Sequence, residues 1–483
     1  MSARTLRHTP TAWMTTPREF ARARGPRFEQ ELCEWLRIPS VSTLPAHRPD
    51  MARAAAWLAR HLGAIGLEAC VIPGDGHPLV YAEWLGAPGR PTILGYGHYD
   101  VQPADPLDRW TSPPFEPSIR GGNLYARGAA DNKGQIFTLI KAAEAYLATG
   151  APLPVNVKVL VEGEEECGGS VLGAYLQIHP DRLGADAAIV LDSGMLEPGT
   201  PAITLGLRGI ASAEVEVRGP ARDLHSGLYG GAAPNPFLAL AQILAGLKDV
   251  EGRILIPHFY DRVIPPDPEE QAGWNRLRFD DAAFLRDEVG AAALVGEPSF
   301  SVLERLWTRP TLDVHGMPGG FIDDGIKTVI PARARAKVSM RLVARQDPLE
   351  IDEHFAAHVR RIAPPGVQVA VCGRGGAPPV LIDRRSPAIV AAAAAFAEAF
   401  GRDTVFIRSG ATVPVVSDLS EGLKLPTIVT GWALPDANWH SPDEKLSLAQ
   451  FHRGIDALMR FFERFGASPG GRGGTKTARP HSG

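Results

Sequence analysis

The sequence predicts an α/β protein built on a mostly parallel sheet, and two observations point to this fold class. Amphipathic, helix-like stretches alternate with short apolar runs between Arg27 and Asp192, as they do in α/β folds. Three of those runs, at residues 91–97, 155–161 and 187–191, are bounded by Gly or polar residues, as buried strands are. If these strands are parallel, their carboxyl ends meet at the sheet edge where such folds place ligand sites.

The pattern changes along the chain, and each change predicts further elements. Polar and apolar residues alternate in two later segments, as in strands of a half-exposed sheet, before an Ala-rich helix and a last buried strand restore the first pattern. In chain order we expect helices at 28–36 and 52–62, a strand at 91–97, a helix after Asp131, strands at 155–161, 187–191, 212–218 and 334–342, a helix at 387–400 and a strand at 425–431.

The chain is expected to form two domains, because 483 residues exceed what one hydrophobic core usually serves. The alternating strands and a Pro-rich interval between them place an inserted α+β domain at residues 207–384. The first domain is then discontinuous, at 18–206 and 385–465. Residues 1–17 carry no periodic pattern and residues 466–483 are Gly-rich, so we expect both ends to be disordered.

Composition limits the function. Hydrophobic residues make up 45% and charged residues 22% of the chain, as in ordinary globular proteins. Lys and Arg total 50 against 54 Asp and Glu, giving a net charge of -4 without a long basic run, so no nucleic-acid partner is expected. No stretch predicts a membrane span or an export signal, and the four cysteines lack CxxC spacing. We therefore expect a cytoplasmic protein without a membrane partner.

Each of the three buried strands ends at a residue that can bind a metal ion. His98 and Asp100 follow the first strand, three glutamates at 164–166 follow the second, and Asp192 follows the third. Imidazole with carboxylate oxygens suits zinc, with manganese or cobalt as substitutes. Asp100 can hold the second imidazole nitrogen while His98 binds the metal. Three adjacent glutamates at the end of a buried strand need cations or protons, which a ligand and a neighbouring general base would provide.

Two further residues complete this set, although each has an ordinary structural explanation. Asp131 could simply be a helix N-cap, and His440 lies in a polar loop after the last buried strand. Similarly, His98 could be a surface histidine, the glutamates a solvated charge run and Asp192 a turn residue. Together these explanations need several coincidences at one sheet edge, so the sequence favours a metal site. Cys167 is expected to be a small buried thiol outside that site.

Six ordered segments resemble the motifs of the di-zinc metallopeptidase family that contains carnosinase, cytosolic nonspecific dipeptidase, bacterial dipeptidases and aminoacylase. The segments are HYDVQP at 98–103, GAADNKG at 128–134, EGEEECG at 162–168, GLRG at 206–209, DLHSGLYGG at 223–231 and HSPDEK at 440–445. The resemblance spans about residues 25–465 and is closest to the carnosinase-like dipeptidases. It implies a zinc-peptidase catalytic domain with an inserted lid and dimerisation domain, in a homodimer that hydrolyses dipeptides.

The resemblance also implies individual roles. Asp131 would bridge two zinc ions, with one His and one carboxylate completing each ion. Glu165 would be the general base for a metal-bridging water, and the resulting hydroxide would attack the amide carbonyl. The implied metal ligands are His98 and Asp192 for one ion, Glu166 and His440 for the other, and Asp131 for both.

Three residues are implied to contact the substrate. His225 would reach into the partner's site and stabilise the oxyanion, and Arg341 would clamp the substrate carboxylate with its planar guanidinium. Thr412, in RSGATVP at 408–414, keeps a hydroxyl where the carnosinase-like enzymes read RxGGSxP, although Ala411 replaces a glycine.

Asp192 favours the dipeptidase branch, because the related acylases tend to have Glu at this position. One alternative is an N-acyl or N-carbamoyl amino acid amidohydrolase of the same fold. Another is an inactive binding or scaffold protein. Retention of Glu165 argues against the latter, since a binding protein needs no base.

Overall fold

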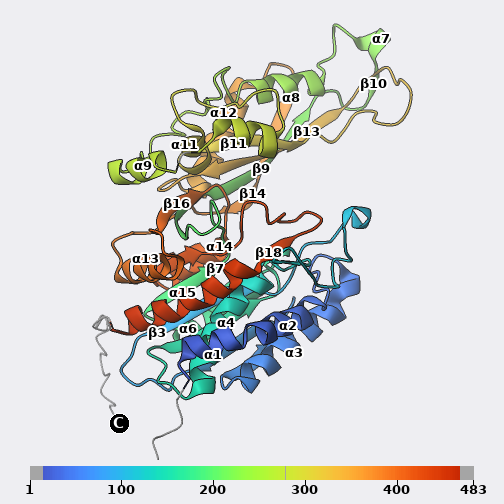
Figure 1. Cartoon of the computed structure of the whole chain (residues 1–483). Helices are drawn as coiled ribbons and strands as arrows, with labels where there is room; N and C mark the ends of the chain where they lie inside the picture. The colour runs from blue at the N-terminus through green and yellow to red at the C-terminus, as the bar shows by residue number, and fades with distance from the viewer. Residues whose placement is uncertain (1–14, 278, 468–483) are drawn as a thin grey trace, which may run out of the picture. The chain divides into compact units, whose positions relative to one another are not determined.

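The computed structural model describes residues 15–277 and 279–467, which form two compact units (Figure 1). The first unit contains the chain up to Ile203, residues Asp383–Val405 and the chain from Asp418 onward. The second unit contains Thr204–Ile382 and Phe406–Ser417. Among the described residues, every helix is too short or too polar to cross a membrane.

A mostly parallel sheet forms the centre of the first unit, as predicted. Its first six strands run in the order β1, β2, β6, β3, β7, β17, and the last four of these are parallel to one another. β2 joins β6 antiparallel, and β1 joins β2 in the same way. β3, β6 and β7 are almost entirely buried, which explains why they read as continuous apolar runs. The strand bounds are β1 Glu68–Ile72, β2 Leu79–Trp84, β3 Thr92–His98, β6 Asn156–Glu162, β7 Ala187–Leu191 and β17 Thr427–Thr430.

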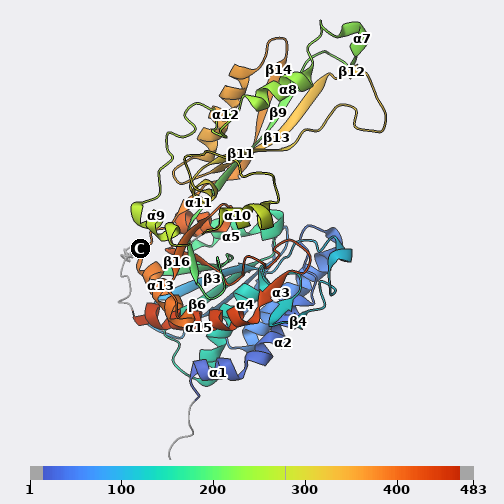
Figure 2. The ribbon, with the colours of Figure 1, turned by 45° about the horizontal axis from the view of Figure 1, so that its top comes forward.

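Helices cover this sheet (Figure 2). α4 packs on β3, α3 on β1 and β2, and α13 on β17, while α15 packs against both α4 and α13. α4 ends at Gly150, whose φ of 68° places it in the left-handed region that favours glycine. A small antiparallel sheet joins β18 to β5 and β5 to β4. The bounds are α1 Pro17–Ala23, α2 Gly25–Leu36, α3 Arg48–Ala64, α4 Lys133–Thr149, α5 Val171–Ile178, α6 Pro180–Leu183, α13 Pro387–Phe400, α15 Leu448–Ala467, β4 Ser118–Arg120, β5 Asn123–Tyr125 and β18 Lys445–Ser447.

The second unit is an α+β structure built on an antiparallel sheet in the order β11, β13, β9, β14. Burial alternates residue by residue along β9, and the buried side chains pack with α8 and α12 in one hydrophobic core. β10 and β12 form a separate two-stranded sheet. The bounds are β9 Gly209–Arg218, β10 Leu224–His225, β11 Thr311–Gly316, β12 Val329–Ile330, β13 Arg333–Leu342, β14 Gln368–Ala377, α7 Ser226–Tyr229, α8 Pro236–Ala245, α9 Pro268–Asn275, α10 Asp281–Ala283, α11 Val302–Trp307 and α12 Pro348–Ile362.

The expected domain boundaries need correction at one internal segment. Residues 385–465 were expected to belong wholly to the first domain, but Phe406–Ser417 lies in the second unit. There β16 (Val405–Ser409) pairs with β8 (Ala202–Leu207). Arg408 also forms a buried ion pair with Glu270 at 2.6 Å. The insertion itself runs from 204 to 382 rather than from 207 to 384.

The expected disordered ends need a smaller correction. Residues 1–14 and 468–483 lie outside the described part of the chain. At the amino-terminal side, however, α1 already begins at Pro17, and the side chain of Thr16 caps it by accepting from the N–H of Glu19. At the other side, α15 continues to Ala467. Ordered structure therefore extends slightly beyond the predicted limits.

Candidate metal centre

The first group of potential ligands lies where two adjacent parallel strands end. His98 is the last residue of β3, Asp192 directly follows β7, and Asp131 lies in the loop before α4. His98 Nε2 lies 3.1 Å from Asp131 Oδ1 and 3.9 Å from Asp192 Oδ1. Their ligand atoms all lie within 4.8 Å of one another. This geometry follows from the parallel arrangement of β3 and β7, which brings their carboxyl ends together.

The second group shares Asp131 with the first. Asp131 Oδ2 lies 2.9 Å from Nε2 of His440, and the same nitrogen lies 3.3 Å from Oε1 of Glu166. Asp131 therefore presents one oxygen to each group, as a bridging ligand must. Its side chain is buried, whereas 53% of the His440 side chain is exposed. The structure thus brings all five predicted ligands together in one place.

Electrostatic effects indicate that these carboxylates require positive charge. Burial opposes protonation of His98, but hydrogen bonds to Asp100 and Asp131 raise its pKa well above the ordinary value. Hydrogen bonds to Asp131 and Glu166 raise the pKa of His440 to about 10. Burial would raise the pKa of Asp131, but hydrogen bonds from His440 and His98 lower it. The carboxylates therefore draw protons onto the histidines, and divalent cations could supply that charge instead.

The three adjacent glutamates have different surroundings. Glu164 accepts hydrogen bonds from the backbone N–H groups of His77 (2.9 Å) and Val171 (3.2 Å), which is a structural role. Glu166 belongs to the second ligand group, and Glu165 belongs to neither group. Burial raises the pKa of Glu165 to about 8, and nearby carboxylates add to the shift while His98 opposes it.

Asp100 connects the two groups, but not quite as predicted. His98 Nδ1 hydrogen-bonds to the backbone carbonyl of Asp100 at 3.0 Å, and the Asp100 carboxylate lies at 3.3 Å. The other carboxylate oxygen, Oδ2, accepts from the backbone N–H of Glu166 at 3.0 Å. Asp100 therefore orients the imidazole of one group and the chain segment of the other.

Two supporting residues were not identified from the sequence. Asn132 donates to Asp192 Oδ1 (2.9 Å) and accepts from the backbone N–H of His98 (3.2 Å), so it links two ligands of the first group. Gln102 donates to Glu166 Oε2 at 2.8 Å. Both residues lie inside segments that carry ligands, and their proximity to Asp131 and Asp100 in the chain was the available signal.

The residues fit a pair of divalent cations. Each group offers an imidazole nitrogen and carboxylate oxygens, which is the donor set that zinc and manganese accept. Asp100 Oδ1 and Glu166 Oε1 are buried, and each faces only a histidine nitrogen at 3.3 Å, without a well-formed hydrogen bond. Buried carboxylate oxygens that lack a well-formed hydrogen bond are costly unless a cation or proton compensates them. The donor set and these two oxygens therefore support a metal centre.

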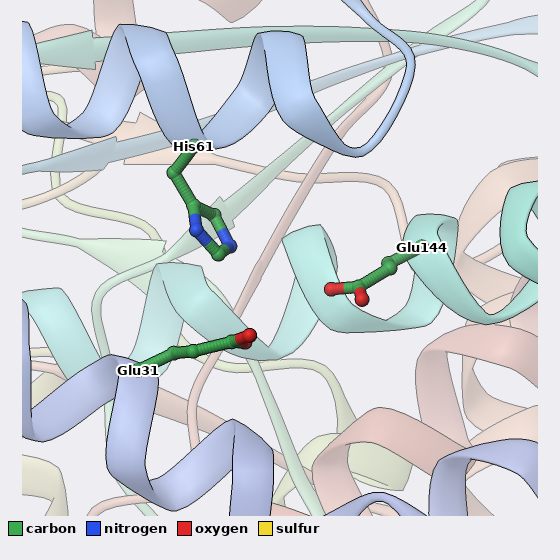
Figure 3. A group of neighbouring side chains, drawn as sticks. All are labelled: Glu31, His61 and Glu144. Atoms are coloured by element: carbon green, nitrogen blue, oxygen red, sulfur yellow. The ribbon is translucent and has the colours of Figure 1, made fainter.

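A third group of similar composition differs from the other two. Glu31, His61 and Glu144 come from α2, α3 and α4 and point toward one another (Figure 3). Nζ of Lys141, however, lies 2.5 Å from Glu31 Oε2, 2.7 Å from His61 Nε2 and 2.6 Å from Glu144 Oε2. The buried ammonium group takes the position that a metal ion would need.

The predicted substrate-binding residues all lie in the second unit. Arg341, on β13, donates to the hydroxyl of Thr412 at 2.6 Å. That hydroxyl in turn donates to the backbone carbonyl of Arg208 at 2.7 Å. Arg341 and Thr412 are therefore in direct contact. His225 is exposed at the end of β10, and its Nδ1 accepts from the N–H of Gly227 at 3.0 Å.

Comparisons with known proteins cover both units. The model of peptidase family M20/M25/M40 matches residues 94–464. Beta-Ala-His dipeptidase of Homo sapiens is 31% identical over 453 residues, which are 90% of this chain and 89% of that protein. The solved structure of di-peptidase Dug1p from Saccharomyces cerevisiae is 27% identical with a TM-score of 0.80, covering 95% of this chain and 99% of its own. The structure of metallo-carboxypeptidase Sso-CP2 from Sulfolobus solfataricus is 31% identical with a TM-score of 0.81, covering 91% and 99%.

Proposed function

Because the chain belongs to peptidase family M20/M25/M40, we propose that it is a metal-dependent dipeptidase. The observation that carries this proposal is the position of Asp131, whose two oxygens face His98 and His440 in separate ligand groups. Such a shared carboxylate suits a two-metal hydrolase. The similarity to Beta-Ala-His dipeptidase and to di-peptidase Dug1p supports a dipeptide as the substrate.

We assign the two cations as Zn²⁺, with Mn²⁺ or Co²⁺ as substitutes. When bound, they would polarise the amide carbonyl and lower the pKa of the attacking water. The first ion would be held by His98, Asp131 and Asp192, and the second by Asp131, Glu166 and His440.

Proton transfer is assigned to Glu165. It is next to the ligand Glu166 in the chain but lies outside both ligand groups, so its carboxylate is available for chemistry. It would take a proton from the attacking water and deliver it to the amine that leaves. Asp100 and Gln102 would keep His98 and Glu166 in position during this step.

Substrate selection is assigned to the second unit. The contact between Arg341 and Thr412 restrains a guanidinium group that can bind a carboxylate with two parallel hydrogen bonds. A substrate held in this way needs a free carboxyl terminus. Dipeptides meet this requirement, and so do longer peptides cleaved at their last bond, as the similarity to carboxypeptidase Sso-CP2 would allow.

A hydrolysis screen of the full-length protein tests this proposal. The protein, loaded with Zn²⁺ or Mn²⁺, is incubated with free dipeptides, with N-acetyl and N-carbamoyl derivatives of their carboxyl-terminal amino acids, and with tetrapeptides. We expect release of amino acids chiefly from the dipeptides. Preferential cleavage of the N-acyl or N-carbamoyl compounds would replace the proposal with an amidohydrolase, and preference for tetrapeptides would replace it with a carboxypeptidase. Turnover of none of these would favour an inactive binding protein.

We further propose that the protein acts as a homodimer in the cytoplasm and that His225 works in the partner's site. Large apolar side chains are exposed near His225 and along the segment before β12, which supports a protein interface: Leu228 (76%), Tyr229 (43%), Ile322 (86%) and Ile326 (93%). All four cysteines are unpaired, as is usual in a reducing compartment.

Mixing two inactive variants tests the shared site. His225→Ala and Glu165→Gln subunits are combined in equal amounts under conditions that allow subunit exchange. Random pairing makes about half of the dimers mixed, each with one intact site, so about one quarter of wild-type activity should return. If exchange is confirmed by mass-tagged subunits and no activity returns, His225 does not act across the dimer.

A further inference from the structure

A buried carboxylate outside the ligand groups joins the two loops that carry Asp131 and His440. The side chain of Glu444 is fully buried and lies four residues after His440. Both of its oxygens are saturated with short hydrogen bonds. The donors are the backbone N–H groups of Gly128 (2.9 Å), Ala130 (2.8 Å) and Asp131 (2.9 Å), and Nη1 of Arg127 (2.8 Å).

The loop before α4 is folded around this carboxylate. Gly128 has a φ of +87°, and a Cβ there would lie 2.7 Å from Cγ1 of Val101, so the loop requires glycine at this point. Its N–H groups converge on one anion, as in the backbone nests that bind anionic groups. The bond from the N–H of Asp131 fixes the backbone of the residue that both histidines contact.

The loop that carries His440 has an unusual backbone conformation. Asn438, His440 and Asp443 have φ values of 56°, 56° and 57°, in the left-handed region that few non-glycine residues adopt and that Asn, Asp and His enter more readily than the others. Glu444 is the residue through which this loop is bonded to the Asp131 loop in the protein interior. The left-handed residues and the buried hydrogen bonds of Glu444 are thus adjacent in the chain.

We propose that Glu444 is a positioning residue that sets the separation between Asp131 and His440, and thereby the affinity for the second cation, without contacting either ion. This inference rests on the proposed metal-dependent function. It extends that function to a residue that belongs to neither ligand group. The two carboxylate oxygens of Glu444 accept hydrogen bonds from the Asp131 loop, and Glu444 itself is part of the His440 loop. Loss of the carboxylate would therefore release both loops at once.

The test is the Zn²⁺ affinity of Glu444→Gln in the full-length protein, measured by competition with a chromophoric chelator. An amide keeps the size of the side chain but turns an NH₂ group toward N–H donors. Removing such supporting partners typically weakens metal binding by about 10- to 100-fold, and we expect a loss in this range for one of the two Zn²⁺ ions, the one assigned to Asp131, Glu166 and His440. Activity should recover substantially when Zn²⁺ is raised to saturation, because Glu444 does not take part in the chemistry.

Asp443→Asn is the matched control. Asp443 is the neighbouring acidic residue on the same loop, accepts from the backbone N–H and the hydroxyl of Thr111, and is more exposed. Asn tolerates the same backbone conformation, so Zn²⁺ affinity should stay within about threefold of wild type. Wild-type affinity in Glu444→Gln would overturn the proposal. Failure of the wild-type protein itself to bind Zn²⁺ would instead overturn the metal-dependent function.

Arg127→Met separates positioning from general stability. It removes the charged partner of Glu444 but leaves the three backbone hydrogen bonds. We expect a lower melting temperature with Zn²⁺ affinity close to wild type. If affinity falls in Arg127→Met as far as in Glu444→Gln, the pair acts through stability alone and the positioning role is wrong. If Glu444→Gln does not fold, preserved affinity in Arg127→Met supports the proposal and lost affinity contradicts it.

Discussion

Two regions of the first unit gather histidine and carboxylate side chains at metal-ligand distances, and they differ in the source of their positive charge. Around Asp131 the positive groups are His98 and His440, whose charge depends on bound protons. Between Glu31 and Glu144, the two carboxylates shown in Figure 3, the positive groups are the buried ammonium group of Lys141 and the guanidinium group of Arg27. A histidine can exchange its proton for a metal ion, whereas a buried lysine occupies the centre of its cluster.

This comparison shows that residue types and distances do not by themselves identify a metal site. The cluster around Asp131 sits where parallel strands end, and a ligand can reach its exposed His440. The cluster around Lys141 lies between three helices and is closed by its own cation. We therefore interpret the first as a functional centre and the second as a structural ion pair network.

The strongest test of this difference is Asp131→Ala. Removal of the shared carboxylate takes a ligand from both groups at once, so both bound metals and hydrolysis should fall to background. Metal content is measured by elemental analysis after gel filtration. The matched control is Glu31→Gln in the other cluster, which should keep full metal content. If the two variants retain equal amounts of metal, the distinction between a metal centre around Asp131 and a structural ion pair network around Lys141 is wrong.

Glu165→Gln should lower the hydrolysis rate without lowering the metal content of the centre around Asp131. The amide cannot accept a proton, and Glu165 is not in either ligand group, so metal content should stay near wild type. The loss of a general base typically lowers the rate by about 10² to 10⁴. Steady-state kinetics and elemental analysis on the same sample check this expectation. Joint loss of metal and activity would make Glu165 a ligand.

Lys141→Met should make the cluster of Glu31, His61 and Glu144 more similar to the metal centre around Asp131. Glu31 and Glu144 would then keep only the partly exposed guanidinium group of Arg27 as a cation, and we expect a loss of about 3 kcal/mol in unfolding free energy. Zn²⁺ could replace the ammonium group and would restore about 2.7 kcal/mol at 100 times its Kd. Thermal unfolding with and without Zn²⁺ is best compared in an Asp131→Ala background, where the main site is removed. No stabilisation by Zn²⁺ would mean that the cluster has the wrong geometry for a metal.

The smallest expected effect is the pH dependence of the unfolding free energy that arises from His61, in the cluster around Lys141. Burial, and then the charge of Lys141, lower the pKa of His61 from 6.5 to about 3. As the pH falls, His61 is protonated in the unfolded chain before it is protonated in the folded protein. The folded protein therefore has its full stability above pH 6.5 and loses stability as the pH falls toward 3. Between pH 7 and pH 5 this amounts to about 2 kcal/mol. Urea unfolding of His61→Gln should show a pH dependence weaker by that amount, and an unchanged dependence would exclude His61 as its source.

The fold and the ligand positions were largely predictable because they follow from local patterns. The apolar runs that became β3 and β7 end at His98 and Asp192, and the parallel arrangement places those ends together. The local pattern alone could not separate the three glutamates, and only the family resemblance implied a general base at Glu165 and a ligand at Glu166. Only the structure turns Glu164 to backbone N–H groups and Glu166 to His440.

Other features depended on contacts between distant parts of the chain. Arg408 lies 138 residues from Glu270, so nothing near Arg408 in the sequence indicated that residues 406–417 leave the first unit. Glu444 was hidden for the same reason, because its partners lie more than three hundred residues earlier. Cys167 was expected to be buried but is exposed, because it is the last residue of the short 3-10 turn Glu165–Cys167 that follows the buried strand β6.

The path of the backbone through the two units limits how such a protein can be rearranged by recombination. The chain passes between the units four times, at 203/204, 382/383, 405/406 and 417/418. Excision of residues 204–382 alone would leave the Arg408 guanidinium without the buried carboxylate of Glu270. An exchange of the second unit between homologous genes must therefore carry two separate coding stretches together. A crossover that transfers only the longer stretch would combine Arg408 and Glu270 from different parents, and only parents that match at both positions would yield a stable chimera.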